Sequence, residues 1–257
     1  MKKKYIFFDI DGTLSDNGYV PESTKIALKK LRENGHFTAI CTGRGSSTAW
    51  KILEQYGFDN MVCDGGNGFV INKKLIEVKP LDKEKVINLI DECEEKGIPW
   101  GYTPSYKDEF RYTKTHRFID IAGAFTDNYK FKVIPDLDVR KEKSIYKTYI
   151  ACLPGEETNI DSLKQIDWIR FSGNVIFVEP MNKSIGIKKM MDYLGGEYKD
   201  VVVFGDEKND LSMFLDEWTC IAMGNAIDEV KKKANYITND MHEDGIYNAC
   251  KHFGWID

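Results

Sequence analysis

The chain has 257 residues, of which 42% are hydrophobic and 30% are charged, and its formal net charge is −5. This composition is typical of a globular protein and excludes the disordered and fibrous classes, while the acidic balance disfavours a nucleic-acid partner. No run of about 18 apolar residues predicts a membrane span. Six cysteines without a C-x-x-C pair indicate reduced thiols, so we expect a cytoplasmic protein with no membrane partner.

The first part of the chain alternates the patterns of strands and helices. Short apolar runs predict strands, and apolar residues at helical spacing between them predict crossover helices, which together favour a parallel sheet. The expected elements are a strand over 4–10, a helix opening at 21–24 and ending at 34–35, a strand over 36–41, a helix over 47–56, a strand over 60–63 and a hairpin over 69–78.

The same alternation resumes near the end of the chain, after a middle segment that is richer in aromatic and basic residues. A helix over 185–194, a strand over 201–204 and a last helix over 244–253 are expected there. The middle predicts a helix over 82–96 and strands over 145–153 and 175–178. We therefore expect an α/β fold with a Rossmann-like parallel sheet core formed by 1–80 and 182–257, and an α+β domain inserted over 81–181.

Two carboxylates, Asp9 and Asp11, directly follow the first apolar run. If the strand continues through them, the period of two places both on the same side of its carboxyl end. Like charges in one small space share a proton or need a cation between them, so a divalent metal is expected. Gly12 then lets the backbone turn sharply and approach a ligand.

Two further strand ends carry polar residues that suit a phosphate and a metal. In an open α/β sheet, ligands bind beyond the carboxyl ends of the strands. Thr42 and Gly43 follow the second strand, and the run from 205 to 210 follows the late apolar strand with Asp206, Asn209 and Asp210. Carboxylates suit Mg²⁺, whereas hydroxyl and backbone donors suit phosphate oxygens, so the three strand ends together predict one site for both.

The Asp9-to-Thr13 run, Thr42-Gly43, Lys183 and the 205–210 run, in this order, resemble the haloacid dehalogenase-like (HAD) superfamily of phosphohydrolases. The inserted middle, the 201–214 segment and Ala222-Met-Gly-Asn-Ala226 are similar to its Cof-type branch, which carries a C2B-type cap. The resemblance covers the whole chain, although the cap matches only in length and placement. The segment 64–68 is similar to the family's Asn-Gly-Ala turn, with one extra glycine.

The resemblance implies a role for each matching residue. Asp9 would be the nucleophile that forms an aspartyl-phosphate, and Asp11 the general acid for the leaving group and then the base toward water. The implied Mg²⁺ ligands are Asp9, the backbone carbonyl of Asp11, and Asp206, with Asp210 beside or behind them. The implied phosphate-binding residues are Thr42, Gly43, Lys183 and Asn209. The expected function is therefore a Mg²⁺-dependent phosphatase acting on a small phosphorylated metabolite, such as a sugar phosphate.

Three alternatives stay open at this point. A phosphomutase or phosphotransferase would pass the phosphoryl group from Asp9 to a sugar hydroxyl, and a non-catalytic phosphoacceptor would retain it. A dinucleotide-dependent oxidoreductase would use 43–48, a near match to G-x-G-x-x-G, with Asp64 as the ribose acid. That third interpretation lacks the third glycine and leaves Asp9, Asp11 and Asp206 unexplained.

Two groups of residues have open roles. Arg44 suits either a phosphate contact or a pair with a core acid. In the middle segment, a basic and aromatic stretch either contacts the leaving group or forms an ordinary solvated edge with core aromatics. Its members are Tyr106, Arg111, Tyr112, Lys114, His116 and Arg117.

Overall fold

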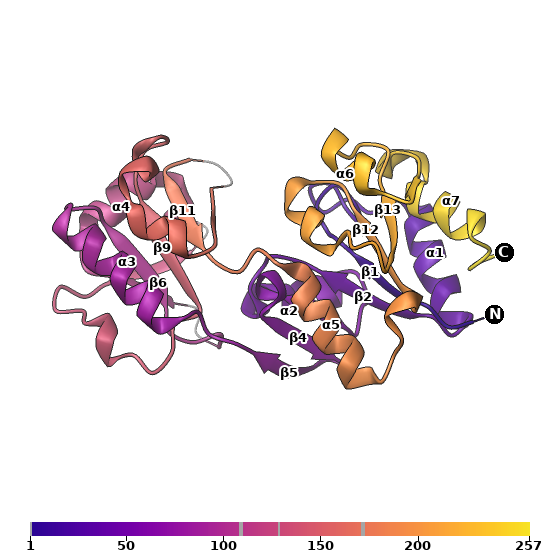
Figure 1. The fold of residues 1–257 in the computed structure, drawn as a ribbon, viewed down its shortest axis with the longest axis horizontal. Helices are drawn as coiled ribbons and strands as arrows, with labels where there is room; N and C mark the ends of the chain where they lie inside the picture. Colours follow the sequence, from indigo (N-terminus) through magenta and orange to yellow (C-terminus); the bar gives the residue numbers. More distant parts are fainter. Residues whose placement is uncertain (1, 108–109, 128, 171–172) are drawn as a thin grey trace. The chain divides into compact units, whose positions relative to one another are not determined.

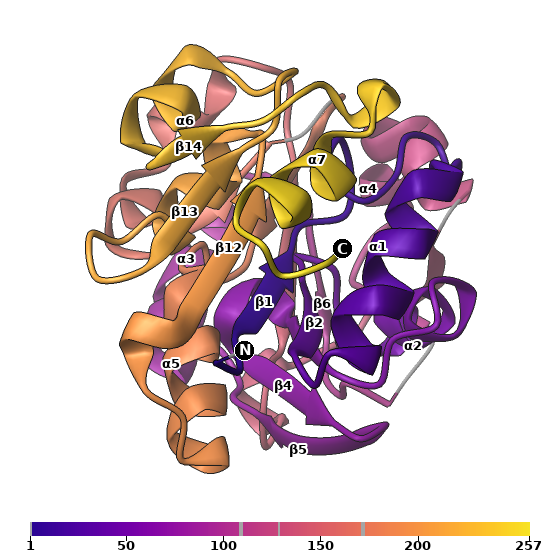
Figure 2. The ribbon, with the colours of Figure 1, turned by 90° about the vertical axis from the view of Figure 1, so that its right-hand side faces the viewer.

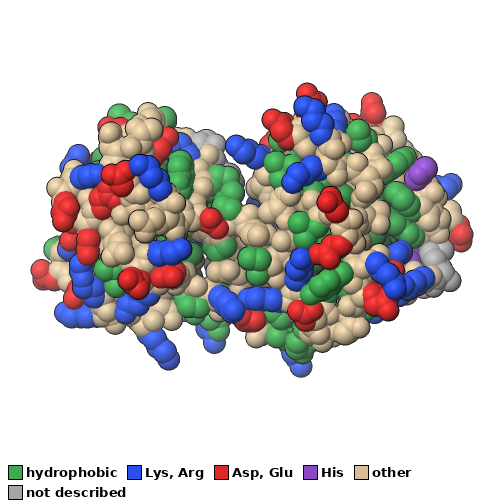
Figure 3. Space-filling model, in the orientation of Figure 1, with side chains coloured by type: hydrophobic (Ala, Val, Ile, Leu, Met, Phe, Trp, Pro, Cys, Tyr) green, Lys and Arg blue, Asp and Glu red, His purple; other side chains and the backbone are tan. Residues whose placement is uncertain are grey.

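The computed structural model describes residues 2–107, 110–127, 129–170 and 173–257, without the side chains of residues 46–49 (Figure 1). The chain forms two compact units. The first, called the core unit below, comprises Met1–Arg44, Thr48–Glu77 and Asn182–Asp257. The second, the inserted unit, comprises Gly45–Ser47 and Val78–Met181. On the face drawn in Figure 3, acidic and basic side chains are interspersed over each unit.

Within the described residues, the core unit contains an eight-stranded sheet in the order β14-β13-β12-β1-β2-β3-β4-β5. Neighbouring strands from β14 to β3 pair in parallel, and β4 is antiparallel to β3. The strands are β1 (Tyr5–Phe8), β2 (Phe37–Cys41), β3 (Met61–Cys63), β4 (Gly68–Ile71), β5 (Lys74–Val78), β12 (Val201–Gly205), β13 (Thr219–Ala222) and β14 (Tyr236–Ile237). The expected parallel sheet is confirmed, and so is the hairpin expected over 69–78, which forms one edge of the sheet as β4 and β5.

Helices cover both faces of this sheet, as Figure 2 shows for α1 and α5. The fully buried β1 side chains alternate, so Ile6 and Phe8 join one apolar cluster and Phe7 the other. The first cluster includes residues of α1 (Glu22–Glu33), α2 (Ser46–Gln55) and α7 (Gly245–His252). The second includes residues of α5 (Lys183–Leu194) and α6 (Asp228–Lys233). Every strand of the sheet centre is thus buried on both faces, which explains the continuous apolar runs of the sequence.

Two boundaries differ from the expected ones and both affect the site. β1 ends at Phe8, not at residue 10, so the period-two argument does not extend to Asp11. Helix α5 begins at Lys183, two residues before the expected start, because the Asn182 side chain caps it by accepting the backbone N–H of Ser184. Lys183 therefore lies, buried, in the first turn of this helix.

The inserted unit has, in its described part, a six-stranded sheet in the order β10-β11-β9-β6-β7-β8. Its pairs are antiparallel except β7 with β8. Helix α3 packs on one face and α4 on the other. The elements are α3 (Lys83–Glu95), β6 (Trp100–Thr103), β7 (Phe110–Thr113), α4 (His116–Ala122), β8 (Lys130–Val133), β9 (Lys147–Ala151), β10 (Trp168–Ile169) and β11 (Val175–Val178). Only α3, β9 and β11 were expected individually. None of the helices in the described residues has the length and apolar character needed to cross a membrane.

Candidate active site

Asp9 stands at the point where β1 leaves the sheet. Its backbone N–H still donates to the carbonyl of Phe204 in the neighbouring strand, at 3.1 Å, and its side chain is buried. The chain then turns at Gly12, whose φ is +83°. A Cβ at this position would lie 2.1 Å from Oδ2 of Asp206, so only glycine lets the loop come this close to the carboxylate.

Asp206 and Asp210 follow β12 and are held by the start of the next helical turn. The Asp210 carboxylate accepts the backbone N–H groups of Asp206 and Glu207, at 2.9 and 3.1 Å. Thr13, from the loop after β1, donates its hydroxyl to Oδ1 of Asp206 at 2.7 Å. Two segments far apart in the sequence thus fix the orientation of the acids.

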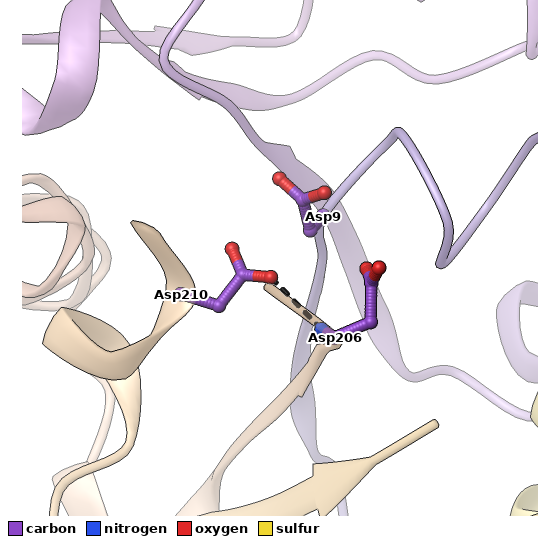
Figure 4. Close-up of side chains that lie close together, drawn as sticks. All are labelled: Asp9, Asp206 and Asp210. Atoms are coloured by element: carbon purple, nitrogen blue, oxygen red, sulfur yellow. Dashed lines mark hydrogen bonds between the residues drawn. The ribbon is translucent and has the colours of Figure 1, made fainter. Parts of the chain in front are cut away.

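Three buried carboxylates share one small space. Ligand oxygens of Asp9, Asp206 and Asp210 lie within 4.8 Å of one another, and Figure 4 shows the three side chains next to one another beyond the ends of β1 and β12. The Lys183 ammonium, itself only 2% exposed, donates to Oδ1 of Asp9 at 2.5 Å and to Oδ1 of Asp210 at 2.6 Å. The cluster therefore contains three carboxyl groups and one ammonium.

Burial and mutual repulsion perturb these groups strongly. Burial first, and then the charge of Asp210, raises the pKa of Asp9 well above its usual range, although Lys183 opposes the shift. Burial raises the pKa of Asp206 to about 7, against the hydrogen bond from Thr13. Burial would lower the pKa of Lys183, but Asp210 and Asp9 outweigh it and raise the pKa above its ordinary value. Strongly perturbed groups in one cluster are typical of functional sites and of cation sites.

Asp11 lies apart from this cluster. Its side chain is 66% exposed, and both of its carboxylate oxygens accept from Nη2 of Arg44, at 2.9 and 2.8 Å. The acids that lie within 4.8 Å of one another do not include Asp11. The period-two argument that paired Asp9 with Asp11 does not apply, because β1 ends at Phe8, before both residues. Arg44 thus pairs with an exposed acid, not with the core acid that was one of its two open roles.

The other expected phosphate-binding residues lie near the strand ends as follows. Thr42 is buried after β2, and its hydroxyl accepts the backbone N–H of Arg44 at 3.1 Å. Gly43 is the next residue of this turn. Asn209 precedes Asp210, and its side-chain amide oxygen is buried with no hydrogen-bond partner among the described residues.

Several residues that the sequence analysis did not assign support the site. Asn225 donates its side-chain amide to the carbonyl of Gly12 at 2.8 Å and accepts the backbone N–H of Met241 at 3.2 Å. Gly66 has φ +104°, and a Cβ there would lie 2.2 Å from the carbonyl oxygen of Asn182, immediately before Lys183. Asn225 belongs to the motif 222–226 and Gly66 to the segment 64–68, which the sequence analysis noted. Neither motif predicts the contact that its residue makes.

The basic and aromatic stretch of the inserted unit does not form one surface. Arg111 and Tyr112 are neighbours on β7 and face opposite sides of the sheet; the Arg111 guanidinium lies 4.7 Å from the centre of the Tyr129 ring. Lys114 pairs with Glu94 at 2.6 Å, and Arg117 donates to the carbonyl of Gly97 at 2.8 Å. The remaining members are Tyr106, which packs edge-on against Tyr146, and His116, which begins α4.

Comparison with known proteins agrees with this geometry. A family model described as haloacid dehalogenase-like hydrolase matches residues 6–250. YkrA of Bacillus subtilis (strain 168) is 30% identical over 261 residues, which cover 100% of both chains. The 5-amino-6-(5-phospho-D-ribitylamino)uracil phosphatase YitU of the same organism is 26% identical over 272 residues, with 98% of each chain covered.

Solved structures give the same result. A hypothetical protein from Geobacillus kaustophilus HTA426 has a TM-score of 0.85 at 30% identity, covering 99% of this chain and 100% of that one. The HAD subclass IIB sugar phosphatase BT4131 has a TM-score of 0.75 at 26% identity, with 99% and 100% covered. The chain therefore belongs to the haloacid dehalogenase-like hydrolases of the Cof type, and it is a phosphatase.

Proposed function

We propose that the protein hydrolyses a small phosphate monoester, such as a sugar phosphate, through an aspartyl-phosphate on Asp9. One observation carries the proposal: three buried carboxylates from two strand ends meet around a single buried ammonium. Burying this much negative charge is costly unless a cation or a ligand compensates it. The family membership leaves the oxidoreductase interpretation without support.

The residues fit a divalent cation. Phosphatases of this superfamily generally use Mg²⁺, and hard cations of this kind take carboxylate and carbonyl oxygens. We propose Asp9, the backbone carbonyl of Asp11, and Asp206 as its ligands, with Asp210 behind them holding Lys183 and the backbone of Asp206. When bound, Mg²⁺ would supply positive charge that offsets the repulsion between a carboxylate nucleophile and an anionic phosphate.

The chain's own residues suit the two chemical steps. In the first, Oδ2 or Oδ1 of Asp9 attacks phosphorus, the bond from phosphorus to the leaving oxygen breaks, and Asp11 gives that oxygen a proton. In the second, Asp11 takes a proton from water, whose oxygen attacks phosphorus and releases inorganic phosphate from Asp9. Asp11 is exposed and its carboxylate is paired with Arg44, so it is accessible to both leaving group and water.

The phosphate oxygens need donors besides the cation. We propose Lys183, the Thr42 hydroxyl, the backbone of Gly43 and the side chain of Asn209 for this role. Lys183 already lies against Asp9, where its charge would stabilise the transferred group. We also propose that the segment 81–181 acts as the cap over the core 1–80 and 182–257. A cytoplasmic location stays a prediction, to which the six buried, free cysteines add support.

The test is release of inorganic phosphate from a panel of phosphorylated metabolites by wild type and by Asp9→Asn. The variant should release none while keeping its fold, and EDTA should silence the wild type. Asp59→Asn is the matched control, because Asp59 is an exposed acid outside the cluster that pairs with Lys73 at 3.4 Å, and its substitution should leave activity unchanged. An Asp9→Asn protein as active as wild type would refute the assignment of Asp9 as the nucleophile. Transfer of phosphate to a second sugar would identify a phosphomutase or phosphotransferase. Phosphate that stays on the protein would identify a phosphoacceptor.

A further inference from the structure

A pocket lies in the core unit, outside the acid cluster. It has a volume of about 600 Å³ and is lined by Leu14 and residues 18–20 of the loop after β1, by one side of α1, and by residues 54–57 at the end of α2. None of the cluster's carboxylates, nor Lys183, lines it. Small-molecule sites typically have about 300–1,000 Å³, so this pocket has room for a metabolite.

The wall that α1 contributes is basic. Lys25, Lys29 and Arg32 line the pocket at successive turns of the helix, against one acid, Glu54. This local excess of positive charge contrasts with the net charge of −5 of the chain. Lys25 pairs with Glu22 at 3.0 Å and Lys29 with Glu33 at 3.8 Å. Exposed pairs of this kind are worth about 0–1 kcal/mol, so both ammonium groups can turn to an anion at little cost.

Arg32 is held in place before any ligand binds. Its Nε donates to the Thr38 hydroxyl at 3.0 Å, and its guanidinium lies 4.8 Å from the centre of the buried Phe58 ring. A guanidinium fixed by stacking and by one hydrogen bond loses little freedom when its other N–H groups bind an anion. Arg32 therefore gives the pocket a preorganised anion-binding group.

Apart from Gln55, which is polar, the rest of the lining consists of apolar and aromatic residues and glycines. Leu14 and Leu28 are buried core side chains that reach the pocket, and Tyr56 packs partly buried against the same core. An inorganic ion would leave this part of the wall uncovered. The chemistry of the lining instead matches an anion that carries an apolar or planar body.

The pocket is continuous with the loop that carries Asp11. The Tyr56 hydroxyl donates to Oγ of Ser15 at 3.0 Å, and the Ser15 carbonyl accepts the backbone N–H of Gly12 at 2.8 Å. Leu14, in the pocket wall, lies between these contacts. An occupant that shifts Tyr56 or Leu14 has a short path of packed and hydrogen-bonded groups to Gly12 and Asp11.

We propose that this pocket binds a small organic anion with an apolar or planar body, and that its occupancy changes the rate of the phosphatase. The second half rests on the assigned phosphatase activity, whereas the first does not. Binding and rate are thermodynamically distinct readouts, so the binding site can fail or hold independently of the proposed roles of Asp9 and Asp11.

The probe is 8-anilinonaphthalene-1-sulfonate, a planar apolar anion without a phosphate group, whose fluorescence is titrated against the whole protein. The double variant Lys25→Glu/Lys29→Glu should weaken binding by about tenfold or more, because two exposed cations become anions. Lys51→Glu, an exposed lysine of α2 outside the lining, is the matched control and should bind as wild type does.

The second readout is hydrolysis of p-nitrophenyl phosphate with and without the saturating probe. The rate should change for wild type and for Lys51→Glu but not for the double variant, whose basal rate should equal that of wild type. Absence of probe binding, or binding that survives the charge reversal, would overturn the site. Binding without any change in rate would overturn the coupling. Loss of activity in Asp9→Asn with unchanged probe binding separates the two proposals.

Discussion

Lys183→Met tests whether the buried ammonium compensates the acid cluster. The substitution keeps the length and apolar stem of the side chain and removes its contacts to Asp9 and Asp210, at 2.5 and 2.6 Å. Removing one partner of a buried charge pair costs about 3–5 kcal/mol. For a unit of this size each kcal/mol lowers the unfolding midpoint by about 2–4 °C, so a decrease of about 10 °C is expected.

The cost should depend on pH, with a sign that follows from Asp9. The pKa of Asp9 is already raised by burial, and loss of the ammonium raises it further. A carboxyl group with a raised folded-state pKa contributes stability that is complete below its unfolded pKa and is lost as pH rises through the folded pKa. Lys183→Met should therefore be less destabilised at pH 5 than at pH 8.

The assay is urea unfolding at both pH values in the absence of Mg²⁺, followed by circular dichroism. Lys188→Met is the matched control: Lys188 lies on the same helix, is 40% exposed and pairs with Glu217 at 2.9 Å. Its loss should cost less than about 1 kcal/mol. Asp210→Asn in the Lys183→Met background should recover part of the stability, since it removes one uncompensated charge. Equal stability of the two lysine variants at pH 8 would show that the ammonium does not compensate the cluster.

Two further predictions concern the loop after β1 and the inserted unit. Gly12→Ala should lower phosphate release by about 100-fold, because the new Cβ would meet Asp206 and displace it. Gly18→Ala is the control: its φ is a similar +86°, but no atom lies within 3.4 Å of the added Cβ, so phosphate release should change less than about twofold. Equal losses in the two variants would refute the steric argument. Glu92 accepts the backbone N–H groups of Asp161 and Ser162 at 2.8 and 2.7 Å, and although burial opposes the shift, these donors and Lys96 lower its pKa to about 2. Glu92→Gln should therefore destabilise the inserted unit by about 1–3 kcal/mol at pH 7, and in urea unfolding this cost should shrink as pH falls from about 4.5 toward 2; a cost independent of pH would contradict it.

The core sheet was predictable because its signals are local. The runs at β1, β2 and β12 are apolar throughout apart from the buried Thr38 of β2, as expected for strands covered on both faces, and glycine or asparagine follows the helices between them. The inserted unit was less predictable. Strands such as β7 and β8 have half-exposed faces on which basic and aromatic residues alternate, so their pattern is shared with loops.

The candidate site also has a part that was predictable from the sequence and a part that was not. That Asp9, Thr42 and Asp206 end their strands at one edge of the sheet follows from parallel pairing, and the sequence indicated it. The pairing of Arg44 with Asp11 rather than with a core acid depends on where β1 stops, and one apolar residue, Ile10, extended the apparent strand beyond its real end. Strand ends are set by where hydrogen bonding to the neighbours ceases, which a single strand's pattern does not contain.

The amino-acid sequence by itself determined the elements of the core, the order of the acids and the family, because periodicity, turn residues and short motifs are properties of neighbouring residues. The tertiary structure alone decided which charges meet. Lys183 reaches Asp9 across 174 residues, and Asn225 reaches Gly12 across 213. Such contacts depend on the register and crossing of elements that are distant in the chain. The same packing forms the basic pocket beside α1, which no local sequence pattern predicts.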